Sequence, residues 1–103
     1  MAERFEYRFD WDPTKAARNA KDHGVTFEQA ATVFLDARSL SQLDDEHGEN
    51  EERWISVGLD KAARLLVVSH TYRNVTSRRA TIRVISARKA TRSEIGAYEE
   101  SKP

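Results

Sequence analysis

Apolar and polar residues alternate strictly in the opening stretch RFEYRFDWD. The spacing of two residues is that of a β-strand with one apolar face. We expect the strand to end at Asp12, because Asp caps helices well and the proline that follows it suits a first helical position. The apolar face would consist of Phe5, Tyr7, Phe9 and Trp11.

Helical spacing replaces the alternation in the segment that follows. A short helix is predicted to run to about Asp22, and Gly24 is placed to end it in the left-handed conformation. The side chains predicted to face inward are Ala16, Ala17 and Ala20.

A second helix is predicted in TFEQAATVFLD. Thr26 and Gln29 have the spacing of a capping box, and the pattern predicts that the helix ends near Ala37. Its apolar residues fall at i, i+3, i+4 and i+7, namely Phe27, Ala30, Ala31 and Phe34.

The second half of the chain contains three segments with strand character. After a polar strand or loop (Ser39 to Leu43) come RWISVGL, ARLLVVSHTY and ATIRVISA. RWISVGL alternates, with Ile55, Val57 and Leu59 on one face and Trp54 and Ser56 on the other. Short connections between consecutive strands favour an antiparallel meander.

The last predicted element is a helix. It begins at a second capping box made by Thr91 and Glu94. The resulting order of strand, two helices, strands and helix predicts an α+β fold, and 103 residues make a single domain over 1–103.

The charges are separated along the chain although their sum is zero. Residues 1–60 hold seven Lys/Arg and fourteen Asp/Glu, whereas residues 61–103 hold ten and three. Positions 44–52 contain six acids and no cation; positions 72–92 contain seven cations and no acid. This separation indicates two surfaces of opposite charge, of which the basic one suits phosphate.

The composition excludes two kinds of structure. Without cysteine the chain has neither disulfides nor a thiolate metal site, which suits a reducing compartment. Its longest fully aliphatic run, Leu65 to Val68, is too short for a signal-peptide core or a membrane span. A cytoplasmic protein is expected.

The basic segment TIRVISARKATRSE carries the clearest candidate site. Arg83 lies between two apolar strand residues, and Arg88 and Lys89 lie where the strand should end. The helix start at Thr91 directs backbone N–H groups to the same place, so the segment predicts a phosphate site. A solvated basic face, or Arg83 paired with an acid of the first half, explains the same pattern.

Other ionisable residues give weaker signals. His70, at the end of the central strand, has a side chain suited to proton transfer, although a single histidine there is more often structural. Glu52 beside Arg53 is a candidate base or a partner in a cross-strand ion pair. Asp44 to His47 could hold a cation but match no calcium-loop spacing, so no metal is expected.

Three motifs carry a resemblance to a known family. They are W-D-x-x-K-x-x-x-N from Trp11, H-G-V-x-F-E from His23 and I-S-A-R-K-A-T from Ile85. On these motifs the chain resembles the BrnT family of type II toxins from about Phe9 to Tyr98.

The resemblance implies a RelE-like fold, in which helices cover one face of a small antiparallel β-sheet and the other face receives RNA. It implies a ribonuclease that needs no metal or other cofactor and inhibits translation and growth. It also implies neutralisation by a BrnA-type ribbon-helix-helix antitoxin. Operator DNA would be bound only through the toxin–antitoxin complex, which represses its own promoter.

Metal-independent RNA cleavage suggests roles for the candidate residues. Attack by a 2′-hydroxyl needs cations at the phosphorane, a base and an acid. We expect Arg83 and Arg88 to stabilise the transition-state charge, Arg53 to add a third cation, and His70 or Glu52 to transfer protons. The residues expected to hold backbone phosphates are Lys89, Arg73 and Arg92.

Two other functions fit the same sequence. A non-catalytic module that binds nucleic acid or an antitoxin and acts as a co-repressor would carry the same basic face. A small-molecule-binding domain would instead require a deep apolar pocket.

Overall fold

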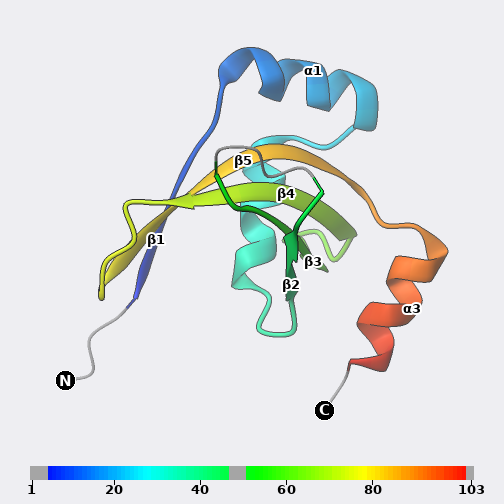
Figure 1. Cartoon of the computed structure of the whole chain (residues 1–103). Coiled ribbons are helices and arrows are strands. Elements are labelled where there is room, and N and C mark those ends of the chain that lie inside the picture. The colour runs from blue at the N-terminus through cyan, green and yellow to red at the C-terminus, as the bar shows by residue number, and fades with distance from the viewer. Residues whose placement is uncertain (1–4, 47–50, 102–103) are drawn as a thin grey trace.

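The computed structural model describes residues 5–46 and 51–101 of the chain. It has one five-stranded sheet with helices, which confirms the α+β class (Figure 1). The elements in chain order are β1 (Glu6–Asp10), α1 (Pro13–His23), α2 (Phe27–Ala31), the 3-10 helix η1 (Thr32–Leu35), β2 (Leu40–Asp44), β3 (Arg53–Leu59), β4 (Leu65–Arg73), β5 (Arg79–Lys89) and α3 (Arg92–Glu100).

The strands follow the order β1-β5-β4-β3-β2. β2 to β5 are joined antiparallel, as the short connections predicted. β1 pairs with β5 in parallel, with Phe9 opposite Ile82, so the sheet is mixed at this edge. No hairpin fixes the direction of β1, because two helices follow it before the next strand.

Local capping signals place the helix ends where the sequence predicted them. The Asp12 carboxylate accepts a hydrogen bond from the Lys15 N–H at 3.2 Å, and α1 stops at Gly24, whose φ is +67°. α2 begins with the complete capping box of Thr26 and Gln29.

The second helix is shorter than predicted. It is α-helical only to Ala31 and continues as the 3-10 helix η1 to Leu35. At the junction the Thr32 hydroxyl donates a hydrogen bond to the Gln29 carbonyl at 2.7 Å and accepts one from the Lys61 N–H at 2.8 Å. Such a side-chain bond to the backbone competes with regular helix geometry.

The inward face of α1 differs from the alanine pattern. Ala16 and Ala20 are partly buried as predicted, but Ala17 is exposed, and the buried residue of the helix is Asn19. The Asn19 amide donates to the carbonyls of Val25 (2.9 Å) and Ala87 (2.8 Å), and its oxygen accepts the Ala87 N–H at 3.1 Å. These bonds join α1 to β5.

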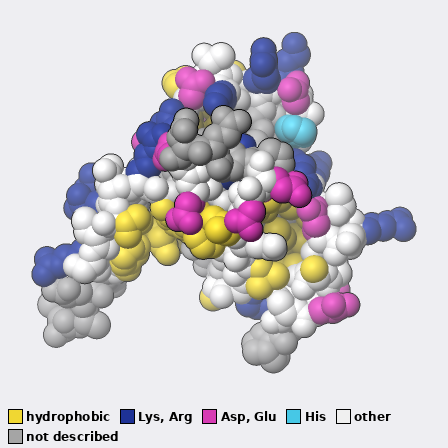
Figure 2. Space-filling model, in the orientation of Figure 1, with side chains coloured by type: hydrophobic (Ala, Val, Ile, Leu, Met, Phe, Trp, Pro, Cys, Tyr) yellow, Lys and Arg dark blue, Asp and Glu magenta, His cyan; other side chains and the backbone are white. Residues whose placement is uncertain are grey.

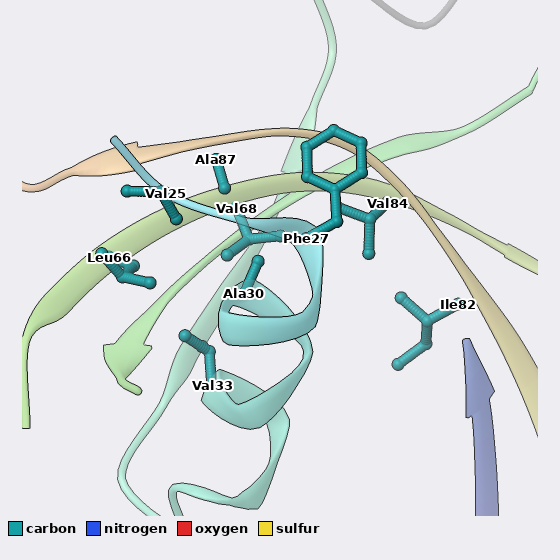
Figure 3. Packing of buried hydrophobic residues seen from close by; sticks show 9 residues of the cluster. All are labelled: Val25, Phe27, Ala30, Val33, Leu66, Val68, Ile82, Val84 and Ala87. Atoms are coloured by element: carbon teal, nitrogen blue, oxygen red, sulfur yellow. The ribbon is translucent and has the colours of Figure 1, made fainter. Parts of the chain in front are cut away.

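The core lies between the helices and one face of the sheet. α1 and α2 contact β5, η1 contacts β3, and α3 lies beyond the end of β5 (Figure 1). Figure 3 shows apolar side chains of α2 directed at those of β4 and β5. The buried cluster is Val25, Phe27, Ala30, Val33, Leu66, Val68, Ile82, Val84 and Ala87.

β3 alternates as predicted, and its most buried residues are small. Ser56 and Gly58 face η1, whereas Ile55 and Val57 on the opposite face are only partly buried. A Cβ on Gly58 would lie 2.9 Å from the Ser39 Cβ, closer than side chains pack. Glycine therefore allows the segment after η1 to approach the sheet.

Candidate functional site

A row of charged and polar side chains crosses the sheet face opposite the core. Residues directly opposite each other in a β-ladder share a face. Arg83 lies opposite Thr71, which lies opposite Arg53, and the row ends in Asp10 on one side and Asp44 on the other. We call this face the arginine face.

A β-bulge brings Arg88 to the arginine face as well. Arg83 and Arg88 are five positions apart, so a regular strand would place them on opposite faces. The register shift between β4 and β5 leaves Ile85 without a partner. Arg83 then lies opposite Thr71 and Arg88 opposite Val67, four residues apart in β4 and therefore on one face.

Three of the predicted arginines form ion pairs with carboxylates of this chain. Their side chains remain between about a third and a half exposed. Figure 2 shows one side of the molecule, on which hydrophobic and acidic side chains adjoin in the middle and basic ones lie mostly at the periphery. The pairs are Arg83 Nη1 with Asp10 Oδ1 at 3.2 Å, Arg73 Nη2 with Glu51 Oε1 at 2.8 Å, and Arg88 Nη1 with Glu94 Oε1 at 2.8 Å.

The start of α3 is occupied by a carboxylate rather than open to phosphate. Glu94 accepts the Thr91 N–H at 2.8 Å, and Thr91 accepts the Glu94 N–H in return. The hydrogen bonds that Arg88 donates to Glu94 hold the pKa of Glu94 at about 2 and raise the pKa of Arg88. The predicted phosphate site at this helix start is thus filled by the chain's own anion.

The remaining predicted cations are not grouped with Arg83. Lys89 lies opposite Leu66, so it leaves the strand on the helix-covered face, the other face from Arg88. Arg92 is exposed at the first position of α3. Within the described residues neither of these two side chains forms an ion pair.

His70 lies in the core, which corrects its predicted role. Its side chain is fully buried on the helix-covered face, with ring contacts to Phe34 and Tyr72. Burial lowers the pKa of His70 to about 4, so the ring is neutral at pH 7. It cannot exchange protons with a substrate on the arginine face.

A hydrogen-bond chain links His70 to the edge of the sheet. His70 Nε2 lies 2.8 Å from the Ser56 Oγ, which lies 2.7 Å from the Ser41 Oγ. Nδ1 has no partner among the described residues, and an unpaired acceptor is tolerated better than an unpaired N–H. The proton therefore belongs on Nε2, which donates to Ser56, so the chain fixes the strands rather than activating a serine.

Glu52 belongs to a different surface from the arginine row. It lines an open pocket of about 590 Å³ on the helix-covered side of the sheet, beyond the core. Trp54 and Tyr72, which line the same pocket, share the face of His70. We define the aromatic pocket by Phe5, Tyr7, Trp54 and Tyr72 with Glu51 and Glu52 at its rim.

Two residues of the arginine row were not identified from sequence. Asp10 is one of the polar residues that alternate with the apolar residues of the opening strand, and this pattern gives it no special role. Thr71 is 5% exposed, and its hydroxyl has no hydrogen-bond partner in the described part of the chain. Only the pairing of β1, β5 and β4 brings them beside Arg83, a relation that alternation within one segment cannot reveal.

Asp44, which ends this row, is the first residue of the acidic segment considered as a cation site. His47 of the acidic segment lies outside the described residues, as do its neighbours to position 50. Among residues 5–46 and 51–101, no three His, Asp or Glu side chains are placed to hold a metal ion. No helix in these ranges has the length and hydropathy needed to cross a membrane.

Comparisons with known proteins agree with the fold. The crystal structure of the Brucella abortus ribonuclease toxin BrnT is similar, with a TM-score of 0.58 and 22% sequence identity over 84% of this chain and 100% of that one. None of the curated proteins matches this chain. The family model for the ribonuclease toxin BrnT of type II toxin–antitoxin systems matches residues 11–94. The chain therefore belongs to the BrnT family of type II ribonuclease toxins.

Proposed function

We propose that this chain is an endoribonuclease that cleaves RNA on the arginine face without a metal ion. The observation that carries the proposal is the row of Asp10, Arg83, Thr71 and Arg53 on the sheet face opposite the core. Family membership supports the ribonuclease activity, and the row supports its location.

The row supplies the cations and the base for 2′-hydroxyl attack, and the 5′-oxygen that leaves phosphorus would take its proton from water. As the 2′-oxygen bonds to phosphorus, negative charge collects on the phosphorane oxygens, and the guanidinium groups of Arg83 and Arg53 would stabilise it. Asp10, 3.2 Å from Arg83, is the carboxylate placed to accept the 2′-hydroxyl proton. It takes over the role first considered for His70 and Glu52, which lie elsewhere.

The ion pairs of the arginines are compatible with RNA binding. Arg83 and Asp10 have side chains that are 32% and 49% exposed, and pairs so open contribute about 0–1 kcal/mol. An RNA phosphate can replace one carboxylate oxygen on Arg83 at little cost. Asp10 is then left beside the ribose as an unpaired base.

Arginines further along the face would hold the RNA backbone. Arg73 lies at the end of β4 and Arg88 near the end of β5, both on the arginine face. Each would exchange its carboxylate for a phosphate, with Lys89 and Arg92 adding positive charge near the start of α3.

The proposed partner is a BrnA-type antitoxin with a ribbon-helix-helix part. Membership of a type II toxin family supports a protein antitoxin. The complex would bind operator DNA through the antitoxin and repress its own promoter. The free toxin would act in the cytoplasm, where its RNA substrate is.

One observation favours a non-catalytic co-repressor instead. Arg83, Arg73 and Arg88 are all paired with carboxylates, which reduces the positive charge available to RNA. Turnover separates the two functions, since only an enzyme cleaves RNA.

The deciding experiment incubates purified, antitoxin-free protein with RNA in the presence of EDTA. We expect cleavage, and a loss of at least about tenfold in Arg83→Ala, because one charge-assisted contact to the transition state is removed. Arg18→Ala, an exposed arginine of α1, is the control and should cleave normally. Intact RNA with the wild-type protein, or a melting temperature that collapses in Arg83→Ala, would count against the proposal.

A further inference from the structure

The aromatic pocket gathers apolar surface that the fold leaves uncovered. Among the described residues six large hydrophobic side chains are exposed, and three of them line this pocket. Phe5 and Tyr7 are each 47% exposed and Val75 is 64% exposed. Exposed apolar residues gathered in one concavity mark a binding surface, whereas scattered ones do not.

The rings of the pocket are arranged around an opening. Trp54 packs edge-on against Tyr72 at 5.7 Å between centroids, and Phe5 packs in the same way against Tyr7 at 5.2 Å. The volume of about 590 Å³ is in the range of ligand pockets, about 300–1,000 Å³. The pocket therefore accepts a side chain together with its neighbours.

The charge at the rim selects the occupant. Glu52 has no hydrogen bond or ion pair within the described residues. Glu51 accepts hydrogen bonds from the guanidinium group of Arg73. A phosphate backbone would be repelled here, whereas a cation gains both from the carboxylates and from the ring faces.

We propose that the aromatic pocket receives an Arg or Lys side chain, with its apolar neighbours, from the antitoxin. This inference rests on the proposed antitoxin partnership and locates its contact surface. The pocket opens on the face opposite the arginine row, beside the edge strand β1. Glu51 lies at both surfaces, so a cation bound in the pocket competes with Arg73 for this carboxylate.

The first test compares two charge reversals in the full chain. The probe is the full-length cognate antitoxin, titrated by calorimetry. Glu52→Lys should weaken binding at least tenfold, since it places a cation where the proposed cation binds. Glu46→Lys, an exposed acid of the same segment that does not line the pocket, changes the net charge equally and should have less than a twofold effect.

The second test removes apolar surface without changing charge. Phe5→Ala should weaken antitoxin binding at least fivefold, whereas Leu35→Ala, which truncates a side chain that is 83% exposed on η1, should not. Both variants are also titrated with a single-stranded RNA oligonucleotide. If Phe5→Ala weakens RNA binding and leaves antitoxin binding intact, the pocket stacks bases and the inference is wrong.

The remaining outcomes distinguish this inference from the proposed function. If the wild-type protein binds the antitoxin and both charge reversals bind equally well, or are weakened equally, only the pocket assignment is overturned. If the wild-type protein does not bind the antitoxin at all, the partnership fails and the inference fails with it. Non-additivity between Glu52→Gln and one Lys or Arg substitution in the antitoxin would identify the inserted side chain.

Discussion

Arg88 and Glu94 form a two-point ion pair across the junction of β5 and α3. Arg88 Nη1 lies 2.8 Å from Glu94 Oε1, and Nη2 lies 2.9 Å from Oε2. The same carboxylate completes the capping box with Thr91. One side chain thus fixes the start of the last helix and neutralises a candidate RNA-binding arginine.

Releasing Arg88 should strengthen RNA binding. In Glu94→Gln the amide can still cap α3, but the guanidinium is free to contact a phosphate. The affinity for single-stranded RNA should rise, and the slope of log K against log salt should steepen by about 0.7, which corresponds to one additional phosphate contact. Glu99→Gln on the same helix is the matched control. An unchanged slope in Glu94→Gln would show that Arg88 does not contact RNA.

The same substitution has a defined pH dependence. The pKa of Glu94 is lowered from 4.5 to about 2 in the folded protein, mainly by the hydrogen bonds from Arg88. The stabilisation is therefore complete above about pH 4.5 and is lost as the pH falls towards 2. Glu94→Gln should melt below the wild type at pH 6, and the difference should shrink at pH 3. A constant difference in melting temperature would contradict the ion-pair explanation.

Asn19 should be the most sensitive polar residue of α1. Asn19→Ala leaves the Val25 carbonyl and both backbone groups of Ala87 without their partners in a buried position. We expect a loss of about 3 kcal/mol in the free energy of unfolding, measured in urea at an unchanged m-value. Arg18→Ala, the exposed neighbour, should lose less than about 0.5 kcal/mol. Equal effects would show that the buried hydrogen bonds of Asn19 are not the cause of the loss.

Local signals predicted the parts of this fold that depend on neighbouring residues. Asp12, Gly24 and the two capping boxes placed helix ends correctly, because a cap is made within four positions of the chain. β3 has the bounds of the alternating segment RWISVGL. Because caps and alternation are patterns of neighbouring residues, the sequence also predicted the order of elements and the α+β class.

Local sequence signals could not predict which distant segments pair with each other. Asp10 and Arg83 are 73 positions apart, and nothing near either residue indicates the parallel pair of β1 and β5. The bulge at Ile85 reverses the face of Arg88, and two consecutive apolar residues, Val84 and Ile85, do not by themselves predict a bulge. His70 was considered both for proton transfer and as a structural residue, and nothing near it in the sequence indicates that Phe34 of η1 packs against its ring.

Because His70 is buried, the stability of the protein depends on pH in a range above that in which carboxylates titrate. Its pKa is about 4 in the folded protein and 6.5 when exposed, so between these values only the unfolded chain is protonated. Stability is therefore lost as the pH falls from about 6.5 towards 4. We expect about 2 kcal/mol less stability at pH 5 than at pH 7.

Two variants test this assignment by urea unfolding at both pH values. His70→Phe keeps an aromatic ring in the core but does not titrate, so its loss of stability from pH 7 to 5 should be much smaller than in the wild type. His23→Gln changes an exposed histidine and should retain the full dependence. If His70→Phe loses as much stability as the wild type, other groups cause the effect.

Asp10 should separate catalysis from RNA binding. If it accepts the 2′-hydroxyl proton, Asp10→Asn lowers kcat by about 100-fold or more, because the amide cannot take up a proton. RNA binding should not weaken, since the Arg83 guanidinium loses a competing carboxylate. Single-turnover cleavage and the Kd for a non-cleavable RNA carrying a 2′-deoxy substitution measure the two quantities separately.

Glu6→Gln is the matched control for this prediction. Glu6 also lies on β1 and pairs with an arginine of β5, Arg79, at 3.4 Å, but it is outside the row that contains Thr71. Its loss should change cleavage by less than about twofold, since an exposed ion pair contributes little. Equal losses in both variants would mean that β1 acts through its charge. Normal cleavage in Asp10→Asn, with tighter RNA binding, would mean that this carboxylate only restrains Arg83 and that another group moves the proton.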